Sequence, residues 1–412
     1  MSDAGVEVPA SAIPCSGCHG RDGKGKPEGG VTPSDLTWTT LTKPYGVTHP
    51  SGRKHPPYDV KLLKRAISLG ADPAGQTLHV AMPRYRMSLQ DMEDLVAYLR
   101  ELGSGGDPGV SDTAVRVGVV LPPAAGPLSG LGKEVRTVLT ARFEAANREG
   151  GIYGRRIEPR FLEAPAAADQ RRGWTADFLQ REEVFAAVAP FFAGADSEMA
   201  SLFAEKQVPV VGPFSLHPRE EVPLNRYVFY LLPGLETQEK VLAAFAARQG
   251  WPKPRTAHAG DPPAELKRQG ADPILFSGSG PEALEWLRAA DRLGWHPRFL
   301  ATGAAADGSL FVVPAAFNGK IFIALPSEPE RASAQFAALA AAEVLIEAMK
   351  RAGRDLNREA LVDQLESLNA YATPYAPPVT FGPARRLGAR GAYVVRVEGR
   401  ELKGAGGWVA VE

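Results

Sequence analysis

The sequence predicts a multidomain protein in which a small helical segment precedes a larger α/β segment. Three observations support this division. A cysteine-containing motif and one amphipathic helical pattern lie within residues 1–103, and residues 104–113 have the glycine- and serine-rich composition of a linker. Over residues 114–412, apolar runs of strand length alternate with helical stretches. Such alternation is typical of βα units on a mostly parallel sheet.

Length and composition exclude several classes of protein. A chain of 412 residues with 44% apolar content is long enough for two or three domains with their own cores. Its 47 basic and 47 acidic residues balance, so there is no electrostatic basis for binding nucleic acid or an anionic membrane surface. No apolar run approaches the ~20 residues that cross a bilayer, so we expect no membrane insertion.

The motif in the first segment is Cys15-Ser16-Gly17-Cys18-His19, a C-x-x-C-H run. It is typical of covalent haem attachment, in which two thiols bond the porphyrin vinyl groups and the histidine binds the iron. The alternatives are a thioredoxin-like pair, half of a zinc site and a structural disulfide. With only 2 cysteines in the chain, a four-thiolate zinc site is excluded. We expect one haem c at Cys15 and Cys18, with His19 as an axial ligand.

An electron-transfer haem also needs a second axial ligand from farther along the chain, typically Met or His. Ser88 begins a capping-box pattern, which places Met87 and Met92 at the two positions of a hydrophobic staple. Met82 has no such structural position and precedes a proline in a loop, so we expect its thioether to bind the iron. On sequence alone, the remaining candidates are the histidines His49, His55 and His79.

Residues 13–103 resemble a class I c-type cytochrome domain. The resemblance rests on the attachment motif, the Met82-Pro83 loop and the closing helix predicted over residues 88–102, with its Val-Ala-Tyr-Leu run at 96–99. It implies a small all-α domain that wraps one haem, passes single electrons and carries out no substrate chemistry. We therefore expect no enzyme activity, and a redox partner protein such as a dehydrogenase or another cytochrome.

The expected compartment follows from the haem. Residues 1–5 have neither the basic start nor the apolar centre of a signal peptide. Covalent haem of this type is nevertheless assembled on the outer side of the bacterial inner membrane. We therefore expect a periplasmic protein whose signal peptide has been removed.

The second segment reads as a succession of strands and helices, because short apolar runs predict buried strands and apolar residues at helical spacing predict helices. The predicted strands are residues 115–121, 157–162, 184–189, 208–211, 227–231, 274–276, 299–300, 321–325, 393–397 and 408–411. The predicted helices are residues 131–148, 167–181, 197–206, 236–249, 281–293 and 332–351. Prolines around Gly260 disfavour a regular strand and helix there, so we expect one βα unit, and with it the second of two lobes, to be trimmed.

This segment resembles the type I periplasmic solute-binding proteins of the branched-chain amino acid kind. The resemblance rests on the strand at 117–121, the loop at 126–130, the helix end at 145–155 and the runs at 208–213 and 378–381. It implies two α/β lobes that close on a small organic solute by a hinge motion. In that family the binding protein delivers its solute to the permease of an ABC-type importer.

Loops at the carboxyl ends of parallel strands, backed by helix N-termini, present backbone N–H groups that suit a carboxylate. Ala193 and Ala195 stand where the family usually has hydroxyl side chains, which puts amino acid binding in doubt. Asp307 either pairs with an ammonium group or caps a helix. The resemblance assigns these ligand-binding candidates: Ser129, Ala193, Gly194, Ala195, Phe214, Ser215, Thr302 and Asp307.

Two functions are compatible with these patterns. The first is an extracytoplasmic monohaem cytochrome fused to a solute-binding-like domain that binds a small organic ligand or a partner oxidoreductase. The second is a receptor for amino acids, amides or similar solutes in an ABC-type importer, with an accessory or redox-sensing haem. The chain has no phosphate-binding, metalloprotease or serine-hydrolase motif in a suitable context, and we expect no catalytic residues.

Overall fold

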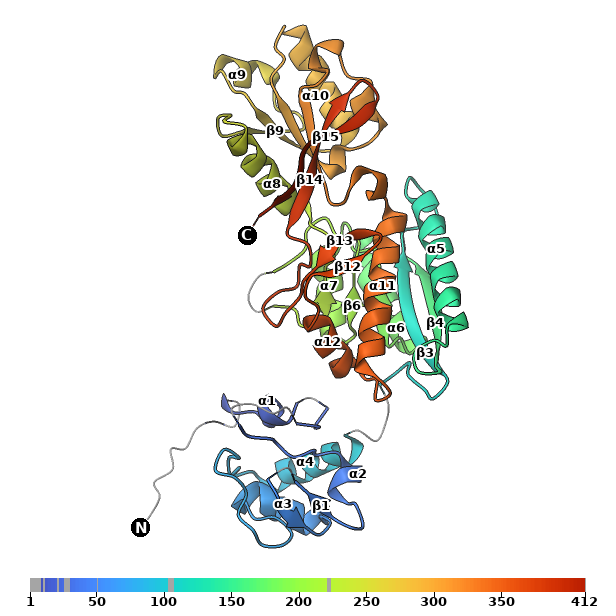
Figure 1. Ribbon diagram of the computed structural model, residues 1–412, viewed down its shortest axis with the longest axis vertical. Coiled ribbons are helices and arrows are strands. Elements are labelled where there is room, and N and C mark those ends of the chain that lie inside the picture. The colour runs from blue at the N-terminus through green and yellow to red at the C-terminus, as the bar shows by residue number, and fades with distance from the viewer. Residues whose placement is uncertain are drawn as a thin grey trace, which may run out of the picture. The chain divides into compact units, whose positions relative to one another are not determined.

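The computed structural model describes residues 9, 12–20, 22–25, 30–49, 51–102, 107–220 and 224–411 (Figure 1). The chain forms two units, residues 1–107 and residues 108–412, and each is described by itself. Within the described residues, no helix is both long and apolar enough to cross a membrane.

The predicted linker at 104–113 is a linker only in part. Residues 104–106 lie outside the described residues. From position 109 onward the chain instead belongs to the second unit, because the Gly109 carbonyl accepts a hydrogen bond from the Arg116 N–H at 2.8 Å and Val110 packs against the core. Position 109 requires glycine, since a Cβ atom there would lie 2.1 Å from the Glu183 carbonyl oxygen.

The first unit is mainly helical. Its largest helices, α3 and α4, contact each other and share an apolar core that includes Leu63, Val96 and Leu99. Met87 and Met92 also pack in this core, as their predicted positions require. The elements in order are α1 (Cys15–His19), α2 (Trp38–Leu41), β1 (Val47–Thr48), β2 (Lys54–His55), α3 (Val60–Leu69) and α4 (Leu89–Glu101).

Side-chain caps set the starts of α3 and α4. The Ser88 hydroxyl accepts a hydrogen bond from the Asp91 N–H at 3.1 Å, so α4 begins where the sequence predicted. The Asp59 carboxylate accepts from the Leu62 N–H at 2.7 Å and starts α3, a helix that the sequence analysis did not predict. The segment between α2 and α3 contains a short antiparallel pair, β1 with β2.

The first lobe of the second unit has a five-stranded parallel sheet in the order β4-β3-β5-β6-β7. Figure 1 shows α5 and α11 side by side, and these helices cover one face of the sheet. α6 and α7 cover the other face, and the alternation along β5 follows this layering: Ala186 and Val188 lie in one core and Ala187 in the other. The strands are β3 (Ala114–Leu121), β4 (Arg156–Glu163), β5 (Ala186–Val188), β6 (Val210–Val211) and β7 (Val228–Phe229). The helices are α5 (Ser129–Arg148), α6 (Ala168–Arg181), α7 (Asp196–Glu205), α11 (Ala334–Ala352) and α12 (Arg358–Glu366), and a hairpin joins β12 (Tyr371–Thr373) to β13 (Ala376–Val379).

The second lobe has a six-stranded sheet in the order β15-β14-β11-β10-β9-β8. β8 to β11 are parallel, and β14 and β15 add to them in antiparallel fashion. The strands are β8 (Arg255–His258), β9 (Ile274–Ser277), β10 (Phe299–Thr302), β11 (Ile321–Leu325), β14 (Gly391–Glu398) and β15 (Glu401–Ala410). The helices are α8 (Leu235–Arg248), α9 (Pro263–Arg268) and α10 (Gly280–Arg292), with short 3-10 turns η2 (Gly303–Ala305), η3 (Gly308–Phe311), η4 (Ala315–Phe317) and η5 (Pro329–Arg331).

The prediction that prolines near Gly260 disfavour a regular strand and helix there is wrong. Strand β8 and the short helix α9 occupy that part of the chain. The prolines do not prevent them, because Pro262 precedes α9 and Pro263 opens it, where a helix has no use for a backbone N–H. The unit is shortened but present.

Candidate functional site

The attachment motif forms the one-turn helix α1. Helical geometry places Cys15, Cys18 and His19 on one face, since residues three and four apart are neighbours. Both thiols are free, with Cys15 half-buried and Cys18 exposed. The zinc and disulfide alternatives gain no support, because the cysteines are unpaired and no cluster of three metal-binding side chains occurs among the described residues.

His19 is held in the orientation that an iron ligand needs. Its side chain is buried, and its Nδ1 lies 2.8 Å from the Ser34 carbonyl oxygen. Because a carbonyl can only accept, Nδ1 carries the hydrogen and Nε2 keeps its lone pair. Burial lowers the pKa of His19, which favours the neutral imidazole that binds metal. The sequence analysis did not identify Ser34, whose role comes from its backbone.

Met82 lies in the loop between α3 and α4, half-buried against the core of the unit. Two neighbours hold this loop. The Arg84 guanidinium donates to the carbonyl oxygens of Met82 and Leu78, and the Tyr85 hydroxyl donates to the Ile13 carbonyl at 2.7 Å. The last bond joins the methionine loop to the segment that leads into α1.

The histidines of the hairpin are engaged elsewhere. Arg53 Nη2 lies 2.9 Å from His49 Nε2 and can only donate, so this ring nitrogen accepts. His55 Nε2 also lies 2.9 Å from His49 Nε2, and His55 Nδ1 lies 2.7 Å from the Pro56 carbonyl oxygen. Both ring nitrogens of His55 are therefore bonded, and His49 Nδ1 lies 3.4 Å from the Ser34 hydroxyl. Because these ring nitrogens already have partners, we consider Met82 a better candidate than either histidine for the second axial ligand.

A buried carboxylate completes this hairpin cluster. Asp72 has no solvent exposure, and its Oδ2 accepts from Arg53 Nη1 at 2.6 Å while its Oδ1 accepts from the Gln76 N–H at 2.9 Å. The carbonyl of Asp72 also accepts from Arg65. The cluster therefore extends from Asp72 through Arg53 and His49 to Ser34, the residue that orients His19.

The residues of the first unit fit a covalently attached haem. The donor set of such a group is two unpaired thiols one helical turn apart, a buried imidazole whose Nδ1 bonds a carbonyl and whose Nε2 is free, and a thioether in a restrained loop. Tyr85 lies beside this site, where burial and then the proximity of Cys15 raise its pKa to about 12. Its hydroxyl is therefore a permanent donor at neutral pH.

In the second unit, a carboxylate from the chain itself occupies the predicted ligand loops. Asp196 begins α7, and its Oδ2 accepts from the Gly194 N–H at 3.1 Å. Its Oδ1 accepts from the Ser215 hydroxyl at 2.5 Å and from the Leu216 N–H at 3.2 Å. Two predicted ligand residues, Gly194 and Ser215, are thus brought together, but they bind Asp196. The sequence analysis missed this residue, although an acid at the first position of a helix is a recognisable signal.

Of the other first-lobe candidates, Ala193, Ala195 and Phe214 lie in the same loops as this cluster. The Ala193 carbonyl accepts from Arg171 Nη1 at 2.7 Å, and the guanidinium carbon lies 5.1 Å from the centre of the Phe191 ring. Ala195 is buried, and the Phe214 carbonyl accepts backbone bonds from the same loop. Ser129 is half-buried at the start of α5.

The second-lobe candidates are structural. Thr302 ends β10 and is 2% exposed. Asp307 caps the 3-10 turn η3, where its carboxylate accepts from the Ser309 N–H at 2.7 Å. Of the two roles considered for Asp307, the structure shows the cap.

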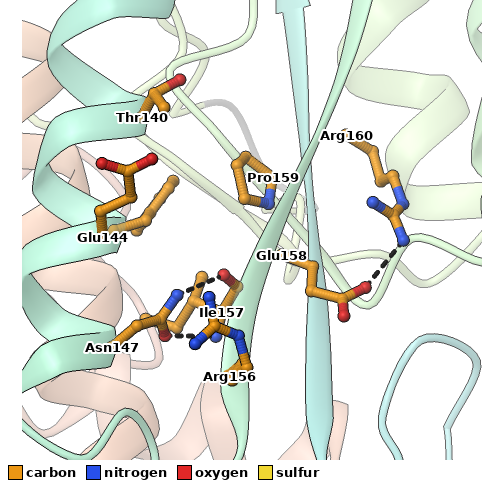
Figure 2. Close-up of a pocket in the computed structure, with 9 residues that line it drawn as sticks. Thr140, Glu144, Asn147, Arg156, Ile157, Glu158, Pro159 and Arg160 are labelled. Atoms are coloured by element: carbon orange, nitrogen blue, oxygen red, sulfur yellow. Dashed lines mark hydrogen bonds and ion pairs between the residues drawn. The ribbon is translucent and has the colours of Figure 1, made fainter.

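Two cavities lie apart from these loops. The first, about 350 Å³, lies between α5 and the edge strand β4, where Asn147 bonds both backbone groups of Ile157 and Glu158 pairs with Arg160 at 2.7 Å (Figure 2). The second, about 220 Å³, has Glu220 and Arg390 among its walls, and these form an ion pair at 2.7 Å. None of the predicted ligand residues lines either cavity.

Both units match models of known protein families. Residues 10–103 match the family model described as cytochrome c, and residues 114–262 and 251–405 match the one described as periplasmic binding protein. The chain belongs to the periplasmic binding protein family and carries a cytochrome c domain ahead of its binding domain. Both predicted resemblances, and the predicted fold class of a small cytochrome c domain followed by a type I binding-protein domain, are confirmed.

Solved structures share the fold of the second unit. A fatty acid ABC transporter substrate-binding protein from Thermomonospora curvata is 19% identical, with a TM-score of 0.56 over 75% of this chain and 94% of that one. A branched-chain amino acid ABC transporter protein from Thermus thermophilus, solved with bound valine, is 16% identical, with a TM-score of 0.58 over 73% and 97%. A leucine-binding protein from Thermotoga maritima is 17% identical, with a TM-score of 0.57 over 72% and 98%. No curated protein sequence matches the chain.

Proposed function

We propose that this protein is a periplasmic single-electron carrier with one haem c, exported with a signal peptide that is then removed. Its binding-protein domain, we infer, docks it to a partner oxidoreductase or lets it respond to a small organic solute. It is not an enzyme, and its electron partner is a dehydrogenase or another cytochrome. The observation that carries the proposal is the bond from His19 Nδ1 to the Ser34 carbonyl, which leaves Nε2 for iron beside two free thiols.

When attached, the haem supplies a one-electron iron couple. The chain's own residues then have separate tasks. Cys15 and Cys18 would hold the group covalently, and the His19 imidazole and the Met82 thioether would bind its iron. An iron bound by both side chains would lack an open site for substrate, which favours electron transfer over catalysis.

The test uses the full chain, exported together with a cytochrome c maturation system. We expect the mass of one haem on the protein and the sharp visible bands of a reduced c-type cytochrome. Reduced wild-type protein should bind carbon monoxide weakly, Met82→Ala should bind it readily, and the core control Met87→Ala should behave as wild type. A protein without haem mass would refute the proposal, and unchanged binding in Met82→Ala would refute the assignment of Met82.

A second candidate function is a solute receptor for an ABC permease, and the family of the second unit supports it. Asp196 argues against amino acids as the solute, because its carboxylate already occupies the loop donors. Measuring Tm with valine, leucine, a fatty acid or a simple amide added shows which of these solutes, if any, the protein binds. A ligand at 100 times its Kd stabilises by about 2.7 kcal/mol. We expect no shift with valine or leucine.

A further inference from the structure

The loop that carries Met82 is anchored at both of its ends and to a distant part of the chain. Tyr85 is 7% exposed, and its N–H donates to the Ile67 carbonyl on α3 at 3.1 Å. Its hydroxyl donates to the Ile13 carbonyl at 2.7 Å, across a separation of 72 residues. Tyr85 therefore connects the loop to α3 through its backbone N–H and to the segment that leads into Cys15 through its side chain.

Arg84 secures the same loop from outside. Its Nη2 donates to the Leu78 carbonyl at 3.1 Å, and its Nη1 donates to the Met82 carbonyl. The guanidinium lies against Gly70, where a Cβ atom would come within 1.7 Å of Arg84 Nε. Gly70 also has a positive φ of 68°, a backbone conformation that favours glycine.

We propose that Tyr85 and Arg84 are positioning residues that keep the Met82 thioether on the iron. This inference rests on the proposed function and adds to it the means by which the second axial bond is maintained. A thioether is a neutral ligand on a flexible side chain, so the fraction of time it is bound depends on how firmly its backbone is held. Every bond of this pair restrains that backbone.

The test measures how well added imidazole replaces the methionine in the ferric, haem-loaded full chain. Tyr85→Phe removes one hydrogen bond and should raise the apparent affinity for imidazole about fivefold. Arg84→Ala removes two, but both are exposed to solvent, so it should raise that affinity only about twofold. The matched control is Tyr98→Phe, which changes an exposed tyrosine of α4 in the same unit. It should bind imidazole as wild type does.

A double-mutant cycle separates positioning from general loosening. In the Met82→Ala background, adding Tyr85→Phe should leave imidazole affinity unchanged, because the ligand that Tyr85 positions is gone. An equal increase in both backgrounds, or a lower Tm in Tyr85→Phe with unchanged imidazole affinity, would overturn the inference. If Met82→Ala itself fails to raise the affinity, the assigned ligand is wrong, and the proposed axial pair fails independently of Tyr85.

Discussion

Removing the Asp196 carboxylate should leave a cluster of hydrogen-bond donors that an added carboxylate can satisfy. In Asp196→Ala, the Gly194 N–H, the Ser215 hydroxyl and the Leu216 N–H lose an ionised acceptor. Hydrogen bonds to charged groups contribute about 1.5–3 kcal/mol each, but Gly194 and Leu216 are exposed and water replaces part of the loss. We therefore expect a total cost of about 2–4 kcal/mol.

Thermal unfolding of the second unit measures this cost. For a unit of this size, about 1 kcal/mol lowers Tm by roughly 2–4 °C, so the variant should melt several degrees below wild type. Sodium acetate should restore part of the difference, and sodium chloride at equal ionic strength should not. Asp177→Ala, at an exposed position on α6, is the control. If acetate stabilises wild type and Asp196→Ala equally, the carboxylate does not act as an internal substitute for a ligand.

Two further predictions concern the polar cluster of the first unit. Asp72→Asn removes the buried partner of Arg53 and should cost about 2–4 kcal/mol in urea unfolding, whereas Asp94→Asn on the exposed face of α4 should cost little; equal costs would contradict the argument. Burial, then Arg53, lowers the pKa of His49 from 6.5 to about 4. As the pH is lowered through 6.5, the unfolded chain therefore takes up a proton at this position before the folded chain does. The free energy of unfolding should decrease as the pH falls from 6.5 to about 4. His49→Gln should weaken the dependence of stability on pH, and the exposed control His79→Gln should not. If both variants give the same stability curve against pH, other groups cause the dependence.

Local signals in the sequence were sufficient for much of the fold. Ser88 sets the start of α4 through a bond to a residue three positions away, so the prediction was accurate to one residue. The nearly continuous burial of the central strands β3 and β11 follows from their apolar composition. The misplaced expectation at α9 arose because Pro262 and Pro263 were taken as breakers, whereas proline at a helix start costs nothing.

In the candidate sites, residues that are adjacent in sequence could be predicted, whereas contacts between residues distant in sequence could not. The C-x-x-C-H motif is contiguous, so its residues could be identified directly, whereas the Ser34 carbonyl that orients His19 is 15 positions away and carries no sequence signal. Asp196 meets Ser215 across 19 positions in another loop. Such pairs depend on how the sheet brings loops together, which the pattern of one strand or helix does not encode.

The order of the strands bears on how the protein matures. The sheet of the second lobe is completed by β14 and β15, which follow the first-lobe helices α11 and α12 along the chain. That lobe therefore cannot close its core until nearly the whole polypeptide is available. The first unit is contiguous in sequence, residues 1–107, and contiguous domains generally fold as units, the N-terminal one first. Under the proposed function, Cys15 and Cys18 would thus be available for haem attachment while the binding lobes are still incomplete.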